Sequence, residues 1–460
     1  MIRRILLGIV GIVVIALIAF GGFYWWQSRP ELPALAQTPT PDSFPREQIE
    51  RGAQLAALGD CTTCHTVPDG KPFAGGLPVS TPFGTLYASN ITPDRETGIG
   101  SWPENAFRRA LREGVGRKGT HYYPAFPYDH FTKASDEDIA AVYAFLMTRQ
   151  PVHQENRQAE LIFPLNWRVF AAGWQLFFLH SGPYQPDTAQ SAEWNRGAYL
   201  VASLGHCGAC HTPRNFLGAE EAKNDLSGGV AEDWIAPALN HNSPAPVPWT
   251  ADQLYAYLRD GFADQHGVAA GPMQPVVFNM QRMPEQDVRA IATYLASVEG
   301  PQDKAARERQ TQAALQFAQQ RAAKEAQGAP NATTGSAGNN ASGNANTNSD
   351  GALIFAGACA TCHHEGGQLP VSRPLPLALS SVVNEDSAAN FVRVVRDGIH
   401  PPNGQRGPIM PGFEGALTNQ QIAALANYVR QQYSQKPGWQ NVDKTVSNAR
   451  GTQAAARGSQ

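Results

Sequence analysis

Three copies of the pattern Cys-x-x-Cys-His constrain this chain more than any other feature. They lie at Cys61–His65, Cys207–His211 and Cys359–His363. The chain has only 6 cysteines, so the motifs use all of them and leave none for a disulfide. Its 460 residues are enough for three domains of about 100–150 residues each. The motifs therefore indicate a chain built from three repeats.

The surroundings of each motif repeat as well. An Arg-Gly-Ala or Gly-Ala sequence precedes each motif, and a predicted helix ending in an acidic residue and glycine follows it. A glycine there suits the left-handed position after a helix end. A further amphipathic helix closes each repeat, and its aromatic residue is expected in the core. These positions are Gly52, Gly197 and Gly351 before the motifs, Gly114, Gly261 and Gly398 after them, and Phe145, Tyr294 and Tyr428 in the closing helices. The pattern predicts an all-α fold.

Composition shifts between the repeats set the domain boundaries. Proline-rich and Gly/Asn/Ser-rich stretches cannot form a core and indicate linkers. The expected segments are a transmembrane anchor or signal (1–28), a linker (29–45), a first domain (46–155), an aromatic interdomain segment (156–190), a second domain (191–300), a helical and then flexible linker (301–350), a third domain (351–435) and a disordered tail (436–460).

The chemistry of Cys-x-x-Cys-His points to covalent haem. Two thiols one helical turn apart can add to the two vinyl groups of a haem, and the next histidine then binds the iron. A single motif could instead be half of a zinc site or a redox dithiol. Three motifs with no spare cysteine, each followed by histidine, favour three covalent haem c groups. The expected attachment residues are Cys61, Cys64, Cys207, Cys210, Cys359 and Cys362, and the expected axial ligands are His65, His211 and His363.

The sixth iron ligand follows from the spacing within the repeat. Met273 lies twelve residues after Gly261, and Met410 lies twelve residues after Gly398. A thioether is a soft ligand that favours ferrous iron and raises the reduction potential. Both methionines stand next to prolines, which stiffen a loop. We expect both as axial ligands, with core packing as the alternative.

The first repeat departs from this pattern. The residue twelve positions after Gly114 is Phe126, which cannot bind iron. His130 is our candidate ligand, His121 is the alternative, and Met147 on the closing helix is a more distant one. A five-coordinate haem, or a ligand from elsewhere, is equally consistent with the sequence.

The N-terminus carries an uncharged stretch from Ile5 to Trp26 behind Arg3 and Arg4. Twenty-two residues of helix span about 33 Å, enough for the hydrocarbon core of a bilayer. We favour a retained transmembrane helix, which would place the haem domains on the periplasmic side of the bacterial inner membrane. The alternative is a signal peptide cleaved near Ala34-Leu35-Ala36.

Residues 44–435 resemble the three-haem cytochrome c subunits of bacterial membrane-bound dehydrogenases. The sequences that carry the resemblance are Trp194-Asn-Arg-Gly-Ala-Tyr-Leu-Val and Gly205-His-Cys-Gly-Ala-Cys-His-Thr-Pro-Arg214. The resemblance implies three tandem class I cytochrome c-like domains and suggests Arg214 beside a haem propionate, although Arg214 could equally be a surface charge. Many relatives have methionine at the position of Phe126. The variant around Phe126 resembles the branch that serves molybdenum hydroxylases.

The resemblance implies an electron relay rather than an enzyme. Electrons would come from a catalytic partner, with a molybdopterin enzyme for aldehydes or N-heterocycles favoured over a quinoprotein alcohol or flavoprotein gluconate dehydrogenase. A small iron–sulfur subunit could accompany it. The acceptor would be ubiquinone or a terminal oxidase. The aromatic stretch Phe163–Tyr184 is expected as a seam between domains, or else at a bilayer surface near a quinone.

Two other functions compete with the relay. A multihaem peroxidase would need an open iron position, and only the first haem offers one. A soluble electron shuttle would need no anchor. The net charge of −3 provides no basic surface for nucleic acid, so no nucleic-acid partner is expected.

Overall fold

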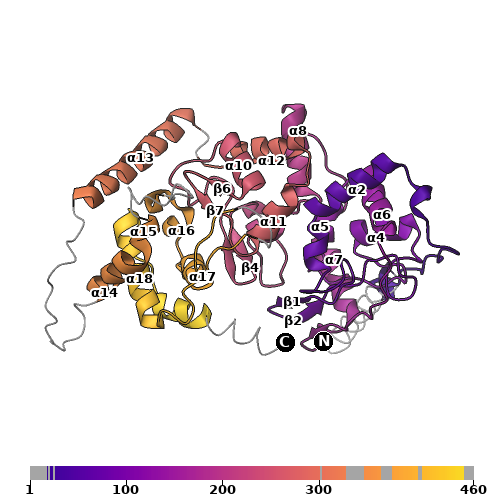
Figure 1. Cartoon of the computed structure of the whole chain (residues 1–460). Coiled ribbons are helices and arrows are strands. Elements are labelled where there is room, and N and C mark those ends of the chain that lie inside the picture. Colours follow the sequence, from indigo (N-terminus) through magenta and orange to yellow (C-terminus); the bar gives the residue numbers. More distant parts are fainter. Residues whose placement is uncertain are drawn as a thin grey trace, which may run out of the picture. The chain divides into compact units, whose positions relative to one another are not determined.

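A computed structural model describes residues 18, 21–23, 26–300, 303–327, 347–363, 376–401 and 407–449 (Figure 1). The chain divides into two compact units. The first comprises Met1–Pro186 and Tyr199–His206, and the second comprises Asp187–Ala198 and Cys207–Gln460. Repeat 1 (46–155) belongs to the first unit. Most of repeat 2 (191–300) and all of repeat 3 (351–435) belong to the second.

Helices dominate both units. The first unit contains η1 (Pro41–Ser43), α2 (Arg46–Leu58), α3 (Cys61–Cys64), α4 (Glu104–Glu113), α5 (Tyr128–Phe131), α6 (Asp136–Met147) and α7 (Arg168–Phe178). Helix α8 (Ala192–Ala202) contributes residues to both units. The second unit contains α9 (Gly208–His211), η2 (Ala222–Asn224), α10 (Ala251–Asp260), α11 (Met273–Met280), α12 (Glu285–Val298), α13 (Lys304–Gln327), α14 (Thr347–Ile354), the π-helical turn η3 (Phe355–Cys359), α15 (Ala360–His363), η4 (Leu377–Leu379), α16 (Ser381–Asn384), α17 (Ala389–Asp397) and α18 (Asn419–Tyr433).

Each repeat is built on two helices that cross at a glycine. A Cβ atom on Gly52 of α2 would lie 1.9 Å from the carbonyl oxygen of Ala141 in α6. The corresponding distances are 1.9 Å from Gly197 of α8 to Ala290 of α12 and 2.3 Å from Gly351 of α14 to Ala424 of α18. Only glycine permits so close an approach. The same close approach occurs in all three repeats.

The predicted helix ends are also present. Gly114, Gly261 and Gly398 all have positive φ, between 63° and 75°, after α4, α10 and α17. The side chain of Ser135 accepts a hydrogen bond from the backbone N–H of Asp138 at the start of α6. Thr418 and Gln421 form a full capping box at the start of α18. Local chemistry therefore determines where these helices begin and end.

The all-α prediction is wrong, because the structure contains small antiparallel sheets. They are β1 (Pro78–Thr81), β2 (Gly84–Tyr87) and β3 (Glu160–Leu161) in one sheet, β4 (Gly229–Ala231) with β5 (Trp234–Ala236), and β6 (Phe262–Ala263) with β7 (Gly267–Val268). The β4–β5 turn has two residues, Glu232 and Asp233, with φ of 50° and 63°. That geometry closes a tight hairpin, but it normally uses Asn-Gly or Asp-Gly. Strands of two to four residues with this unusual turn leave little periodicity in the sequence.

The predicted transmembrane helix also requires correction. Within the part of the chain that the structure describes, no helix is both long and apolar enough to span a bilayer. This finding overturns the expected anchor and, with it, the expected inner-membrane location. Most of the stretch 5–26 lies outside the described residues.

Two segments expected to lie outside the domains pack against them instead. Ala318 of α13 is buried in a cluster with Val247, Ala378 and Leu379. Trp439, Val442 and Val446 are buried in the core of repeat 3, so the chain stays packed well beyond residue 435. Val442 and Val446 lie four positions apart in the helical segment 442–449, which suits one helical face, and Trp439 precedes that segment. The predicted flexible linker 328–346 and the tail from residue 450 lie outside the described residues.

Candidate functional site

The histidines of the first two motifs are held by the β-hairpins. The Nδ1–H of His65 donates to the carbonyl oxygen of Ser89 at 2.6 Å, two residues after β2. The Nδ1–H of His211 donates to the carbonyl oxygen of Pro237 at 2.7 Å, one residue after β5. A hydrogen bond at Nδ1 fixes the ring and leaves Nε2 as the metal-binding nitrogen. The hairpins therefore orient the two predicted ligands in the same way.

All three motif histidines are shifted toward the neutral imidazole that binds a metal. Burial lowers the pKa of His65, His211 and His363, and the bonds to Ser89 and Pro237 partly oppose this shift in the first two. The Nδ1 atom of His363 is buried and has no hydrogen-bond partner among the described residues. Residues 364–375, which follow it directly, lie outside that description.

The cysteine thiols are paired in each motif but do not form disulfides. Burial, followed by the neighbouring motif cysteine, raises the pKa of Cys61 and Cys207 to about 12 and that of Cys359 to about 11. A thiol with so high a pKa stays protonated at neutral pH and is a poor nucleophile. This environment argues against a reactive redox dithiol.

Repeats 1 and 2 each contain an Arg–Asp ion pair at the same position, between the helix before the motif and the closing helix. The guanidinium of Arg51 contacts both carboxylate oxygens of Asp138 at 3.1 and 3.2 Å. The guanidinium of Arg196 contacts both carboxylate oxygens of Asp287 at 2.8 Å. Each pair joins the helix before the motif to the closing helix. In repeat 3, Asp350 and Gln421 occupy the positions of Arg51 and Asp138, so this pair is specific to repeats 1 and 2.

The two predicted methionine ligands occupy different backbone settings. Met273 is the first residue of α11, whereas Met410 pairs with Ile399 in an isolated β-bridge of two 2.9 Å hydrogen bonds. Both are half-buried. Met273 and Met410 are equally spaced from Gly261 and Gly398, but this equal spacing does not reflect equal local structure. Both nevertheless lie on the chain segment between that glycine and the closing helix.

The corresponding place in repeat 1 is filled by aromatic rings. The ring of Phe126 meets those of Tyr122, Tyr128 and Phe131 with centroid separations of 5.7, 6.2 and 5.5 Å. Met147, the distant alternative, is buried in the core near the end of α6. The phenyl ring of Phe126 offers no lone pair to iron. Phe126, the residue that departs from the repeat pattern in the sequence, is thus packed within this aromatic cluster.

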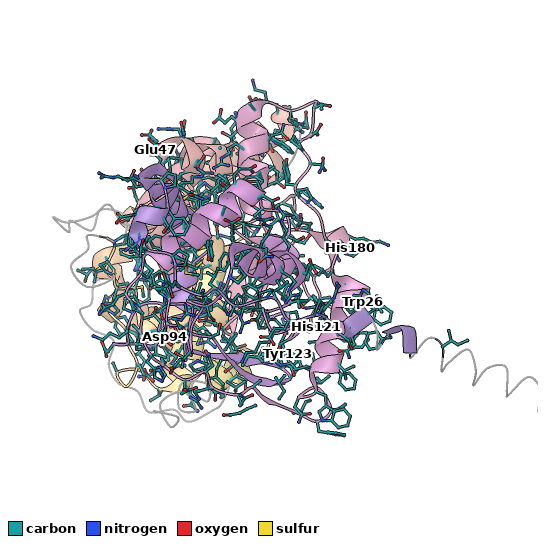
Figure 2. All side chains as sticks on the ribbon, turned by 90° about the vertical axis from the view of Figure 1, so that its right-hand side faces the viewer. Trp26, Glu47, Asp94, His121, Tyr123 and His180 are labelled. Atoms are coloured by element: carbon teal, nitrogen blue, oxygen red, sulfur yellow. The ribbon has the colours of Figure 1, made fainter. Side chains whose placement is uncertain are left out.

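The two candidate histidines of repeat 1 differ in their surroundings. His121 is buried, and both its ring nitrogens have partners, Nδ1 with the side-chain oxygen of Gln175 and Nε2 with the carbonyl oxygen of Gln27 at 2.9 Å. Figure 2 shows it beside Trp26, whose ring centroid lies 6.1 Å away. His130 is also buried, and its Nδ1 lies 3.1 Å from the carbonyl oxygen of Ala202. His121 would have to break two hydrogen bonds to reach an iron.

Arg214 closes a loop of its own domain. Its guanidinium donates to the carbonyl oxygens of Gly218 and Ala209 at 2.7 and 2.9 Å and approaches the carboxylate of Glu220 at 3.4 Å. These contacts fix the chain directly after the second motif. The suggested contact with a haem propionate remains a prediction.

The donor set in repeats 1 and 2 fits covalent haem. Each site combines two thiols on one helical turn with a histidine whose ring is held at Nδ1 and whose pKa is lowered by burial. The carbonyl groups of Ser89 and Pro237 were not predicted, because backbone atoms leave no residue signature. The ion pairs were not predicted either, although Arg-Gly-Ala and Ser-x-x-Asp138 were both visible.

Comparison with known proteins gives a consistent result. The cytochrome c family model matches residues 49–150 and 349–432. The chain is 45% identical to a nicotinate dehydrogenase subunit of Pseudomonas putida over 89% of its own length, but it spans only 32% of that protein. It is 34% identical to the fructose dehydrogenase cytochrome subunit of Gluconobacter japonicus, covering 92% of this chain and 85% of the relative. It is 36% identical to the cytochrome c subunit of the quinone-dependent alcohol dehydrogenase of Gluconobacter oxydans, covering 89% and 80%.

Proposed function

Because this chain belongs to the family of cytochrome c subunits of dehydrogenase complexes, we propose that it carries three haems and relays electrons from a molybdenum-dependent catalytic subunit. Members of this family are electron-transfer subunits that hold covalent haem c and are not catalytic by themselves. The peroxidase alternative therefore has no support among the relatives. The number of haems and the type of partner are the new parts of the proposal.

The matched geometry of the first two motifs carries the proposal. In each, the cysteines would hold the haem and the histidine Nε2 would bind its iron, while the hairpin carbonyl keeps the ring in place. Bound haem supplies a reversible one-electron iron couple. Met273 and Met410 are the proposed sixth ligands in repeats 2 and 3, and His130 is the candidate in repeat 1. The third haem rests on Cys359, Cys362 and His363.

The proposed partner is an enzyme that oxidises an N-heterocycle or an aldehyde. Support comes from the 45% identity to the nicotinate dehydrogenase subunit and from Phe126 in place of methionine. A small iron–sulfur subunit would connect the molybdenum centre to this chain, and ubiquinone or a terminal oxidase would receive the electrons. Quinoprotein and flavoprotein partners are the alternatives, since alcohol and fructose dehydrogenase subunits are also similar over most of their length.

The test is substrate-driven haem reduction in the native complex. The tagged chain is purified from its source with its partner subunits, and haem absorption is followed after adding nicotinate, an aldehyde, ethanol or gluconate. We expect rapid reduction with the N-heterocycle or the aldehyde. Reduction only by ethanol or gluconate would replace the molybdenum partner with a quinoprotein or flavoprotein. A haem count of two or fewer in the pyridine haemochrome assay would refute the three-haem proposal.

A further inference from the structure

The side chain of Asn390 joins repeats 2 and 3 through the two backbone hydrogen bonds that a neighbouring β-strand would make. Asn390 of α17 is buried, and its side-chain oxygen accepts from the backbone N–H of Ile235 at 2.9 Å. Its side-chain nitrogen donates to the carbonyl oxygen of the same residue at 2.7 Å. Ile235 is the central residue of β5, which pairs with β4 on its other side. The exposed edge of the repeat 2 hairpin is thus completed by repeat 3.

The next turn of α17 extends this contact. The Nε–H of Arg393 donates to the carbonyl oxygen of Asp233 at 3.1 Å, and its Nη2 lies 3.6 Å from the Asp233 carboxylate. The guanidinium also lies 5.8 Å from the ring centroid of Trp234. Asn390 and Arg393 are three residues apart and therefore share one face of the helix. That face holds three consecutive residues of the hairpin.

Helix α13 makes a second, independent bridge. At its start, Arg307 donates to the carbonyl oxygens of Glu299 and Trp249 in repeat 2, both at 2.6 Å. Further along, Ala318 is buried against Ala378 and Leu379 of repeat 3 as well as Val247 of repeat 2. A 24-residue helix is a stiff rod about 36 Å long. It is therefore well suited to hold two domains at a fixed separation.

The same interface connects the two loops that carry the proposed methionine ligands. Gln274 follows Met273, and its side-chain nitrogen donates to the carbonyl oxygen of His400 at 3.1 Å. His400 lies next to Ile399, the bridge partner of Met410. In addition, the N–H of Ser381 donates to the carbonyl oxygen of His266 at 3.2 Å. The ligand loops of repeats 2 and 3 therefore adjoin each other.

From these contacts we infer that repeats 2 and 3 form one rigid electron-transfer module and that Asn390 is a positioning residue within it. This inference rests on the proposed function, because both repeats must carry haem. Asn390 sets the separation across which one electron passes, with one iron oxidised as the other is reduced. No bond is made or broken in this step. The rigid contact ensures that the two haems exchange electrons without waiting for domain motion.

The experiment compares Asn390→Ala with Asn90→Ala in the full-length, haem-loaded protein. Asn90 is an equally buried asparagine of repeat 1, whose side chain bonds within that repeat. Electron exchange between haems is followed optically after pulsed reduction, and hydrogen exchange is measured at the Ser381 amide. Losing both Asn390 bonds should raise Ser381 exchange about tenfold, the factor that corresponds to about 1.4 kcal/mol. Inter-haem exchange should become slower or heterogeneous, whereas Asn90→Ala should change neither property.

Two further measurements distinguish loss of the contact between the repeats from a general loosening of repeat 3. The amide of Ile422, inside the core of repeat 3, should stay as protected as in the wild type, because the lost contact lies between the repeats. A second variant, Ile235→Pro, removes the backbone N–H that donates to the Asn390 side chain. It should reproduce the faster Ser381 exchange and the altered inter-haem kinetics. Unchanged Ser381 exchange or unchanged inter-haem kinetics in the variants would overturn the inference, as would equal loosening at Ile422. A haem count below three would refute the proposed function instead, while the Ser381 measurement still tests the contact.

Discussion

Repeats 1 and 2 share a frame but differ at the position of the proposed sixth ligand. In both, two helices cross at a glycine, an Arg–Asp pair ties them together, and a hairpin carbonyl holds the motif histidine. Repeat 2 then offers Met273, whereas repeat 1 has Phe126 inside a cluster of aromatic rings. The comparison shows that the same frame forms whichever residue occupies the position of the proposed sixth ligand. A ligand at that position, and with it the reduction potential, could therefore vary without refolding the domain.

The largest test of the shared frame is to remove the proposed attachment residues. Replacing Cys61 and Cys64 with alanine, or Cys207 and Cys210, should remove one haem of the proposed three in each case, because each pair is proposed to hold one haem covalently. The pyridine haemochrome assay measures the loss. Equal losses support equivalent sites, whereas loss of all haem from one double variant would show that the repeats depend on each other to mature.

The next test exchanges the residues that differ. Phe126→Met should raise the potential of one haem, and Met273→Phe should lower that of another, each by on the order of 0.1 V, because a thioether favours ferrous iron. Redox titration and the ferric iron–sulfur absorption band report the change. If the wild type already shows three iron–sulfur haems, the spacing argument fails for repeat 1.

The histidines of repeat 1 should respond differently to substitution. His130→Ala should convert one haem from low to high spin, since His130 is the proposed ligand. His121→Ala should leave the spin state unchanged, because both ring nitrogens of His121 already have partners. Electron paramagnetic resonance distinguishes the two results. A wild-type spectrum retained by both variants would mean that the sixth position of this haem is open or filled from another segment.

A smaller effect concerns the ion pairs of the two frames. Arg51→Ala and Arg196→Ala should each destabilise their repeat by about 1–3 kcal/mol, because each leaves a mostly buried carboxylate without its bidentate partner. Thermal unfolding of the haem-loaded protein measures the loss. Arg46→Ala is the matched control in α2, since the side chain of Arg46 is 91% exposed and pairs only at the surface. Equal destabilisation by the control would argue against the role assigned to the pairs.

The smallest expected effect is a pH dependence that is strongest in repeat 2. Burial lowers the pKa of His266 to about 3, and its ring stacks on Trp249 at 3.5 Å. The unfolded chain takes up this proton below about pH 6.5, while the folded chain does not. Stability is therefore full above that pH and falls by up to about 1.4 kcal/mol per unit below it. In repeat 1 the corresponding residue is Gly119, which follows Gly114 at the same distance as His266 follows Gly261. Repeat 1 therefore has no histidine at this position.

Hydrogen exchange at pH 7 and pH 5 should thus show greater loosening in repeat 2 than in repeat 1. His266→Gln provides the comparison, because it keeps a polar side chain but cannot take up a proton. If the variant shows the same loss of protection at pH 5, another group is responsible.

The repeats and their motifs could be predicted from the sequence, because each depends on residues close together along the chain, whereas the proposed iron ligands stay predictions. The motif cysteines and histidines lie within five residues, and the helix ends at Gly114, Gly261 and Gly398 depend on local backbone preferences. The hairpins could not be read in this way. Glu232 and Asp233 adopt left-handed conformations that neither residue favours, and only the surrounding packing holds them there.

The packing of segments outside the motifs was even harder to predict from the sequence. Helix α13 has the composition of an exposed helix, yet Ala318 is buried because Val247, Ala378 and Leu379 come together around it from distant parts of the chain. The residues beyond 435 look polar on average, but Trp439 and Val446 are enough to pack them into the core of repeat 3. Composition averages over a segment, whereas burial depends on a few positions.

By itself, the sequence determined that the chain contains three similar repeats, each with a Cys-x-x-Cys-His motif, and that the first departs from the other two at Phe126. These features rest on the identity of single residues and their spacing, which tertiary contacts do not change. Only the tertiary structure decided which carbonyl orients each histidine, that His121 is committed to Gln175 and Gln27, and that Asn390 joins repeat 3 to repeat 2. Such contacts join residues tens to more than a hundred positions apart, and many pairings satisfy the same local preferences. The free energy of packing the whole fold selects among them.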